Sequence, residues 1–299
     1  MQLGLLDFCA LGKRQSPVER VFETVQLVQD AEALGYSRYW LSEHHELSYA
    51  HHSPELLAAI LAGGTERIRV GVAGMLLLLH SPMRVAKSFR LMSALYGGRV
   101  DLGMGSGTSA DAAVLSGMRQ GAPATGPEEY LQRVQQLLAL MRGGESSPVF
   151  NPLDAAPCPL WILGTGTPTT PALAARLGTC FGLSLSFNRS RDDPSLLSVY
   201  RNEFRPTREQ PQPQCIVSVA GVCAETQEEA LRLAEAAPEN PRSGFEVVGT
   251  PAHCHEKLEA LRHRYGVDEL IFLNMAPDQE SRRRSLQLLA EELRLTPSP

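Results

Sequence analysis

A short segment with the sequence YWLSEHH, residues 39–45, places an apolar run directly before a polar and titratable cluster. This order is typical of a β-strand that ends in a functional site. Glu43, His44 and His45 would each lose several kcal/mol of hydration if they were buried without partners, so we expect them where the strand meets a pocket or solvent. Residues 43–45 are therefore the first candidates for catalysis.

Around this segment the chain alternates short β-rich runs with helical patterns, which is typical of parallel βα units. Eight such units in series favour a closed (β/α)8 TIM barrel over a doubly wound sheet. No compositional boundary divides the chain, so we expect one α/β domain over residues 1–299. The predicted strands are residues 3–8, 38–42, 68–73, 100–104, 160–163, 180–184, 215–222 and 269–273.

Pairs of Ser or Thr followed by Pro mark the predicted helix starts. A hydroxyl at the N-cap accepts a backbone N–H, and Pro at the first helical position gives up none that the helix needs. Two helical patterns, residues 226–237 and 251–266, precede the last strand, so we expect one extra helix there. The pairs are Ser16-Pro17, Ser53-Pro54, Ser81-Pro82, Thr167-Pro168 and Thr250-Pro251, and capping boxes are predicted at Ser16 to Glu19 and Thr226 to Glu229.

The composition excludes several classes of protein. With 43% hydrophobic residues, 20% charged residues and a formal net charge of -5, the chain is typical of globular domains. It has no basic excess for nucleic acid and no apolar run long enough for a bilayer. The six cysteines are scattered singly, which indicates reduced thiols rather than a zinc knuckle or redox dithiol. We therefore expect a cytoplasmic protein with no export signal, membrane helix or nucleic-acid partner.

In a TIM barrel the active site lies at the carboxyl ends of the strands. Most residues that follow the predicted strands here are glycines or residues with a hydroxyl group. Glycine lets the backbone approach a ligand, and free N–H groups at a helix start attract anions, so such loops suit a phosphate. Alternatively, these residues only form turns. They are Gly74 and Met75 after the third strand, Gly105, Ser106, Gly107 and Thr108 after the fourth, and Gly164, Thr165, Gly166 and Thr167 after the fifth.

The adjacent histidines favour a pocket residue over a metal site. In strand geometry His44 and His45 project in opposite directions, so only one can face a pocket. Neither this pair nor His51-His52 supplies two ligands on one side of a regular strand, and we expect no metal. The alternative to a catalytic histidine is a structural one that donates a hydrogen bond to a carbonyl near the barrel rim.

Longer segments around these residues resemble the bacterial luciferase-like, flavin-dependent monooxygenase family. The resemblance covers nearly the whole chain and is most specific in the first hundred residues. It rests on GYSRYWLSEHH (35–45), SPE (53–55), TERIRVG (65–71), GRVDLGMG (98–105), AETQEEA (224–230), GTP (249–251) and YGVDEL (265–270).

The resemblance implies a monooxygenase that uses O2 and reduced flavin mononucleotide (FMN), supplied by a separate flavin reductase, to oxidise a small organic or natural-product substrate. It implies that His44 is the active-site histidine. Ala73 and Gly74 match the position of a non-proline cis peptide beneath the flavin ring. Thr165 and Gly166 match the loop that holds the flavin phosphate, and their strand-end neighbours become candidate cofactor contacts.

The chain departs from the family pattern at three places. Ser106 stands where these enzymes usually have an arginine for the phosphate. The lost charge-assisted contact weakens phosphate binding by about 1.5 to 3 kcal/mol unless hydroxyls such as that of Thr108 and backbone N–H groups compensate. Leu78 and Leu79 replace a more polar stretch, and the segment before Pro159 is short. The short segment predicts a more open site or one covered by a partner subunit.

Two other functions remain open at this point. One is hydride transfer with the deazaflavin F420 in the same barrel, and the other is a non-catalytic barrel that binds a flavin or another ligand. Relatives commonly form dimers through early helices of the barrel. The apolar helix predicted at residues 54–62 would serve in such a homodimer, or it belongs to the core.

Overall fold

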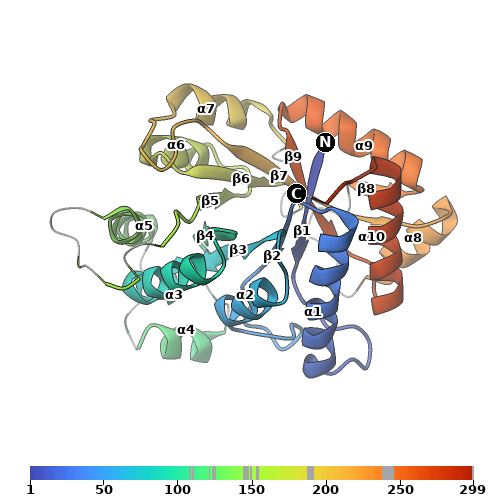
Figure 1. The fold of residues 1–299 in the computed structure, drawn as a ribbon, viewed down its shortest axis with the longest axis horizontal. Coiled ribbons are helices and arrows are strands. Elements are labelled where there is room, and N and C mark those ends of the chain that lie inside the picture. Colours follow the sequence, from blue (N-terminus) through green and yellow to red (C-terminus); the bar gives the residue numbers. More distant parts are fainter. Residues whose placement is uncertain are drawn as a thin grey trace.

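The computed structural model describes most of the chain as a barrel of strands surrounded by helices (Figure 1). Thr108 lies outside the described residues, as does part of the Pro- and Gly-rich segment before Pro159. The described residues are 1–107, 109, 111–120, 122, 126–143, 148, 150–152, 155–186, 192–237 and 246–297.

All strand pairings are parallel, and the sheet closes on itself. The ring runs β1, β2, β3, β4, β5, β6, β7, β9, because β6 also pairs with β7. This confirms the predicted (β/α)8 barrel. The strands are β1 (Gln2–Asp7), β2 (Arg38–Leu41), β3 (Arg69–Leu76), β4 (Val100–Gly105), β5 (Leu160–Gly164), β6 (Cys180–Ser184), β7 (Cys215–Cys223), β8 (Val247–Gly249) and β9 (Glu269–Asn274).

The eight predicted strands form the closed ring, and one further short strand was not predicted. The short strand β8 pairs only with β7 and stays outside the closed ring. The extra helix before the last strand is confirmed, because α8 (Gln227–Glu235) and α9 (Pro251–Tyr265) both precede β9. Three residues are too few to show a period of two in the sequence, so β8 gave no signal.

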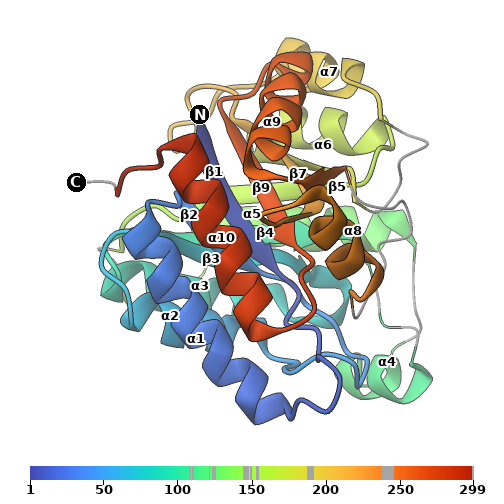
Figure 2. The same cartoon turned by 90° about the vertical axis from the view of Figure 1, so that its right-hand side faces the viewer.

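The helices form the outer layer of the barrel, and α1 and α10 lie side by side in both ribbon views (Figures 1 and 2). In the described part of the chain, every helix is too short or too polar to cross a lipid bilayer. Besides α8 and α9, the helices are α1 (Pro17–Leu34), α2 (Pro54–Gly63), α3 (Pro82–Leu95), α4 (Ala112–Met118), α5 (Pro127–Arg142), α6 (Thr169–Leu177), α7 (Ser195–Glu203) and α10 (Gln279–Leu293), with a 3-10 turn at Leu77–Leu79.

The Ser/Thr-Pro pairs predicted four helix starts correctly and one incorrectly. Ser16 forms the complete capping box with Glu19, whereas the Thr226 hydroxyl only accepts the N–H of Glu229. At the incorrect position, α6 begins at Thr169 rather than after Thr167. The hydroxyl of Thr167 instead pairs with that of Thr170 at 2.9 Å, so it does not cap the helix. The N-caps are Ser16, Ser53, Ser81 and Thr250, and of these four only the hydroxyls of Ser16 and Thr250 accept a backbone N–H as predicted.

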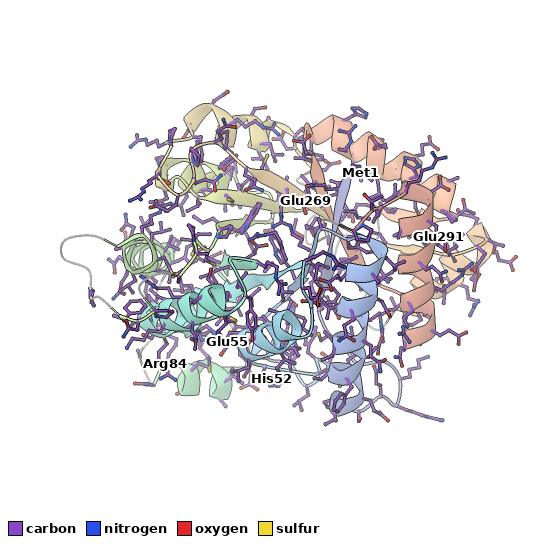
Figure 3. The ribbon with its side chains drawn as sticks, viewed as in Figure 1. Met1, His52, Glu55, Arg84, Glu269 and Glu291 are labelled. Carbon is purple, nitrogen blue, oxygen red and sulfur yellow. The ribbon has the colours of Figure 1, made fainter. Side chains whose placement is uncertain are left out.

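A buried ionic cluster closes the amino-terminal end of the barrel. The guanidinium of Arg38, on β2, donates to Asp101 on β4 at 2.8 Å and to Glu269 on β9 at 2.7 Å. Neither strand is adjacent to β2, so the Arg38 side chain crosses the barrel interior. Figure 3 shows Glu269 beside Met1, where β1 begins. Buried charges of this kind are stable only when they are paired.

Two tryptophans pack above this cluster. The rings of Trp40 and Trp161 meet edge to face with centroids 5.3 Å apart, and both lie 5.2 Å from the guanidinium carbon of Arg38. The Trp40 indole N–H donates to Asp101 at 3.0 Å. These side chains therefore fill the barrel interior near the amino-terminal ends of the strands.

Candidate active site

A cavity of about 460 Å³ opens at the carboxyl ends of the strands. This volume lies in the range typical of small-molecule sites. Trp40 lines its floor, and the residues around it come from β1 to β7 and β9 together with the loops that follow them. The site is therefore where the barrel fold places it.

His44 faces this cavity between two aromatic rings. Its imidazole stacks on Tyr49 with centroids 4.1 Å apart and an interplanar angle of 11°, and Phe8 lies 5.0 Å away. Burial lowers the pKa of His44 to about 4, although Glu46, with an oxygen 3.9 Å from Nδ1, opposes the shift. His44 is therefore a neutral imidazole near pH 7, able to accept a proton.

Glu43 is buried beside the cavity with both carboxylate oxygens engaged. Its Oε1 accepts hydrogen bonds from Nε2 of His45 at 2.8 Å and from Nε2 of His80 at 2.7 Å. Its Oε2 accepts the backbone N–H of Leu76 at 2.8 Å. Burial raises the pKa of Glu43, but these hydrogen bonds outweigh it and lower the pKa. Glu43 is thus a buried anion held in place by its hydrogen bonds, and it connects the loop after β2 to the end of β3.

The two histidines of the opening segment diverge as expected, although both lie in the loop after β2 rather than in strand geometry. His44 lines the cavity, whereas His45 points to Glu43 and does not line it. The hydrogen bond to Glu43 raises the pKa of His45. His80, which the sequence did not single out, joins them from the turn after β3.

Ala73 and Gly74 form a narrow ledge on one wall of the cavity. The peptide bond between them is cis, as the resemblance implied. An added Cβ at Gly74 would lie 2.6 Å from Cδ1 of Leu163 and 2.9 Å from the backbone nitrogen of Gly105, so only glycine fits. The Met75 side chain belongs to the hydrophobic core instead and does not line the cavity, so its prediction as a cofactor contact was wrong.

The loops after β4 and β5 line the same wall. Ser106 and Thr165 are exposed at the mouth, and Thr167 lies beside them. Gly166 is buried with φ +106° and does not line the cavity. Among the described residues of the lining there is no lysine or arginine. The predicted site residues that do line the cavity are Glu43, His44, Ala73, Gly74, Gly105, Ser106, Gly107, Gly164, Thr165 and Thr167.

The opposite wall was not predicted. It is mainly apolar and comes from β1, β7 and β9. Four of these residues lie inside strands, where an inward-facing Ile or Leu has the same pattern as a core residue, and Phe8 directly follows β1, so the sequence carried no separate signal. They are Leu6, Phe8, Ile216, Ser218 and Ile271.

Sequence comparisons agree with this geometry. The family model described as "Luciferase-like monooxygenase" matches residues 1–243. The uncharacterized protein YceB of Bacillus subtilis (strain 168) is 30% identical over 337 aligned positions, which cover 97% of this chain and 99% of YceB. A luciferase-like monooxygenase of Escherichia coli (strain K12) is 25% identical, and the alignment covers 97% of this chain and 88% of the E. coli protein.

Solved structures share the fold along the whole chain. The crystal structure of apo-MsnO8 is 30% identical with a TM-score of 0.90 and covers 99% of both chains. The oxygenating constituent of 3,6-diketocamphane monooxygenase from Pseudomonas putida, solved with FMN, has a TM-score of 0.73 at 19% identity and covers 98% and 97% of the two chains. An F420-dependent secondary alcohol dehydrogenase has a TM-score of 0.69 at 15% identity, and the match covers 99% of this chain and 98% of the dehydrogenase.

Proposed function

Because this chain belongs to the luciferase-like monooxygenase family and is therefore an oxidoreductase, we propose that it uses reduced FMN and O2 to oxidise a small organic substrate. One observation carries the proposal. The neutral imidazole of His44 faces the same cavity as the Ala73 to Gly74 ledge and the hydroxyl-rich loops after β4 and β5. The cavity thus contains a proton acceptor in His44, a backbone surface for a flavin ring at the ledge, and hydrogen-bond donors for a phosphate in the two loops.

The described residues fit a flavin by shape and hydrogen bonding. The ledge at Gly74 leaves no side chain between the strand and a bound ring. Ser106, Thr165 and Thr167 offer hydroxyl groups for the phosphate, and backbone N–H groups at the start of α6 lie next to them. When bound, reduced FMN supplies the electrons that oxygenation requires.

The chain's own residues then perform three tasks. His44 accepts or returns a proton at the reacting atoms. Tyr49 stacks on one face of its ring and excludes water there, and Phe8 packs against the ring at a tilt. Glu43 fixes the end of β3 through the N–H of Leu76, which keeps the ledge in place beside His44.

Hydride transfer with F420 is the second candidate. The described lining has no cationic side chain where FMN enzymes of this family usually place an arginine, which leaves this function open. An F420-dependent dehydrogenase also shares the fold. The two functions differ in whether O2 is consumed.

A flavin titration separates these functions. Reduced FMN and reduced F420 are each titrated into the protein without oxygen, and O2 consumption is recorded after mixing with air. Micromolar binding of reduced FMN and O2 uptake above that of free flavin support the monooxygenase. Tight F420 binding with indifference to O2 supports hydride transfer, and binding of neither overturns both.

The supply of reduced flavin and the assembly state belong to the same proposal. We propose that a separate flavin reductase delivers reduced FMN, so turnover with NADH or NADPH requires that second enzyme. We propose a cytoplasmic homodimer, supported by the six free cysteines and by Leu56 and Ile60 of α2, which are 64% and 58% exposed. Their neighbours Leu57 and Leu61 are buried, so α2 contributes to the core and also presents an apolar outer face.

A further inference from the structure

The cavity has two chemically different walls. The β3 to β5 wall offers the backbone ledge at Gly74 and the hydroxyl-rich loops, to which the proposed function assigns the flavin. The facing wall, from β1, β7 and β9, offers the apolar side chains of Leu6, Phe8, Ile216 and Ile271. A substrate oxidised beside the flavin must lie against this second wall.

No described side chain of the lining can neutralise a charged substrate. The titratable groups there are Glu43 and His44. Glu43 already accepts three hydrogen bonds, from His45, His80 and Leu76, and has no free oxygen. His44 is stacked on Tyr49 and buried, and burial lowers its pKa to about 4, so near pH 7 it carries no positive charge to pair with an anion. A charged group buried here would lose its hydration without compensation.

Neutral hydroxyl groups are the polar feature that remains. Ser184 on β6 and Ser218 on β7 are paired in register, and both line the cavity. Ser42, at the end of β2 on the opposite side of the ring, lines it too. The hydroxyl oxygens of all three are shielded from solvent and have no hydrogen-bond partner in the described part of the protein. Buried hydroxyls normally have partners, so a ligand is a suitable one.

We infer that the substrate is an uncharged, mainly apolar compound that carries a carbonyl or hydroxyl group, bound against the β1, β7 and β9 wall with its oxygen at the Ser184 and Ser218 pair. This inference rests on the proposed function, because the flavin is assigned to the other wall. Ser184 and Ser218 are then specificity-determining residues, and Ile216 and Ile271 shape the apolar part of the site.

Matched probes test the chemical class. Cyclooctanone, cyclooctane and cyclooctanecarboxylate share one skeleton and differ in polarity and charge, and the six-membered and decalin series repeat the comparison at other sizes. Binding to the full-length protein without flavin is measured by calorimetry or ligand-observed NMR. We expect ketones to bind best and carboxylates roughly tenfold or more weakly. Equal or better carboxylate binding, or no ketone binding in any series, overturns the inference.

Variants test the residues. Ser184→Ala and Ser218→Ala should each weaken ketone binding by roughly three- to tenfold and leave the hydrocarbon unchanged. Ser195→Ala, at an exposed serine on α7, is the matched control. Ile271→Lys should reverse the preference toward the carboxylate, and the serine variants decide the matter if that protein does not fold. Unchanged ketone preference in both serine variants would overturn the assignment.

Measuring FMN affinity on the same variants separates a failure of the substrate assignment from a failure of the proposed function. FMN affinity is measured separately on the same variants and should change by less than about twofold, because the serines lie away from the ledge. A loss of FMN affinity with unchanged ketone affinity would mean that the hydroxyls hold the cofactor, and it would overturn the substrate assignment. Failure of the wild-type protein to bind flavin would overturn the proposed function but not a measured ketone preference.

Discussion

The carboxylate of Glu43, just after β2, accepts the backbone N–H of Leu76 on β3 at 2.8 Å. This contact joins the segment that carries His44 to the strand that carries the Gly74 ledge. The other oxygen of Glu43 holds His45 and His80. One buried anion therefore sets the spacing between the candidate catalytic base and the candidate cofactor surface.

Glu43→Gln keeps the size of the side chain and removes its charge. We expect the pKa of His45 to fall toward its ordinary value, because the hydrogen bond to Glu43 raises it. The Glu43–His45 pair stabilises the fold fully below the pKa of histidine in the unfolded chain, about 6.5. This stabilisation is lost as pH rises through the raised pKa of His45 in the folded protein. The loss in unfolding free energy, about 1 to 3 kcal/mol, should thus be larger at pH 6 than at pH 9. Urea denaturation measures it.

Glu292→Gln provides the matched control for that variant. Glu292 contacts His255 at 3.2 Å, but both side chains are partly exposed. Solvent screens such a pair, so its removal should change stability by less than about 1 kcal/mol. An equal effect of both substitutions would show that Glu43 has no special structural role.

His44→Ala should lower turnover by roughly 100-fold, because it removes the proton acceptor of the cavity. FMN affinity should stay within about twofold, since the proposed flavin contacts are the Gly74 ledge and the loops after β4 and β5. Stopped-flow product formation and a fluorescence titration measure the two quantities. His52→Ala, at an exposed histidine of the same loop, is the control. Unchanged turnover would leave His44 with a structural role only.

Tyr49→Ala should raise the pKa of His44 from about 4 toward its ordinary value, because it exposes the stacked imidazole. The loss of activity on acidification should then begin at higher pH. In the wild type, stability falls as pH drops from about 6.5 toward 4, since the unfolded chain binds the proton more tightly. NMR titration of the imidazole measures the shift. Tyr49→Phe keeps the ring and should behave like the wild type.

Ser106→Arg should tighten FMN binding by roughly tenfold or more, because it returns a charge-assisted contact to the phosphate. Riboflavin carries no phosphate, so its affinity should not change. Both dissociation constants come from flavin fluorescence. An equal gain for riboflavin would place the phosphate elsewhere in the cavity.

Leu56→Asp together with Ile60→Asp should weaken dimer formation by roughly tenfold or more, since both exposed side chains lie on the outer face of α2. Sedimentation velocity measures the monomer fraction. Leu231→Asp, at a half-exposed leucine of α8, is the control. A monomeric wild-type protein at micromolar concentration contradicts the proposed homodimer.

The alternation of strands and helices was visible in the sequence because each unit carries its own period and its own cap. The strand at Cys180–Ser184 has the predicted bounds, and the capping box at Ser16 forms as expected. The missed elements lack these signals. β8 has three residues, and α4 (Ala112–Met118) buries none of its described side chains, so it shows no apolar stripe.

The candidate site was predictable on one wall only. Glycine and hydroxyl residues at strand ends stand out from the apolar strands before them, which identified Gly74, Ser106 and Thr165. Ser218 and Ile271 lie inside strands, and only their inward direction makes them cavity residues. Likewise, a sequence shows that Glu43 is near His45 but not that His80 arrives from another turn to share its oxygen.

The paired charges of Arg38, Asp101 and Glu269 close the barrel at its amino-terminal end. Flavin and substrate would therefore both enter and leave through the opening at the carboxyl ends of the strands. Because they share this route, each should slow the exchange of the other when it is present in excess.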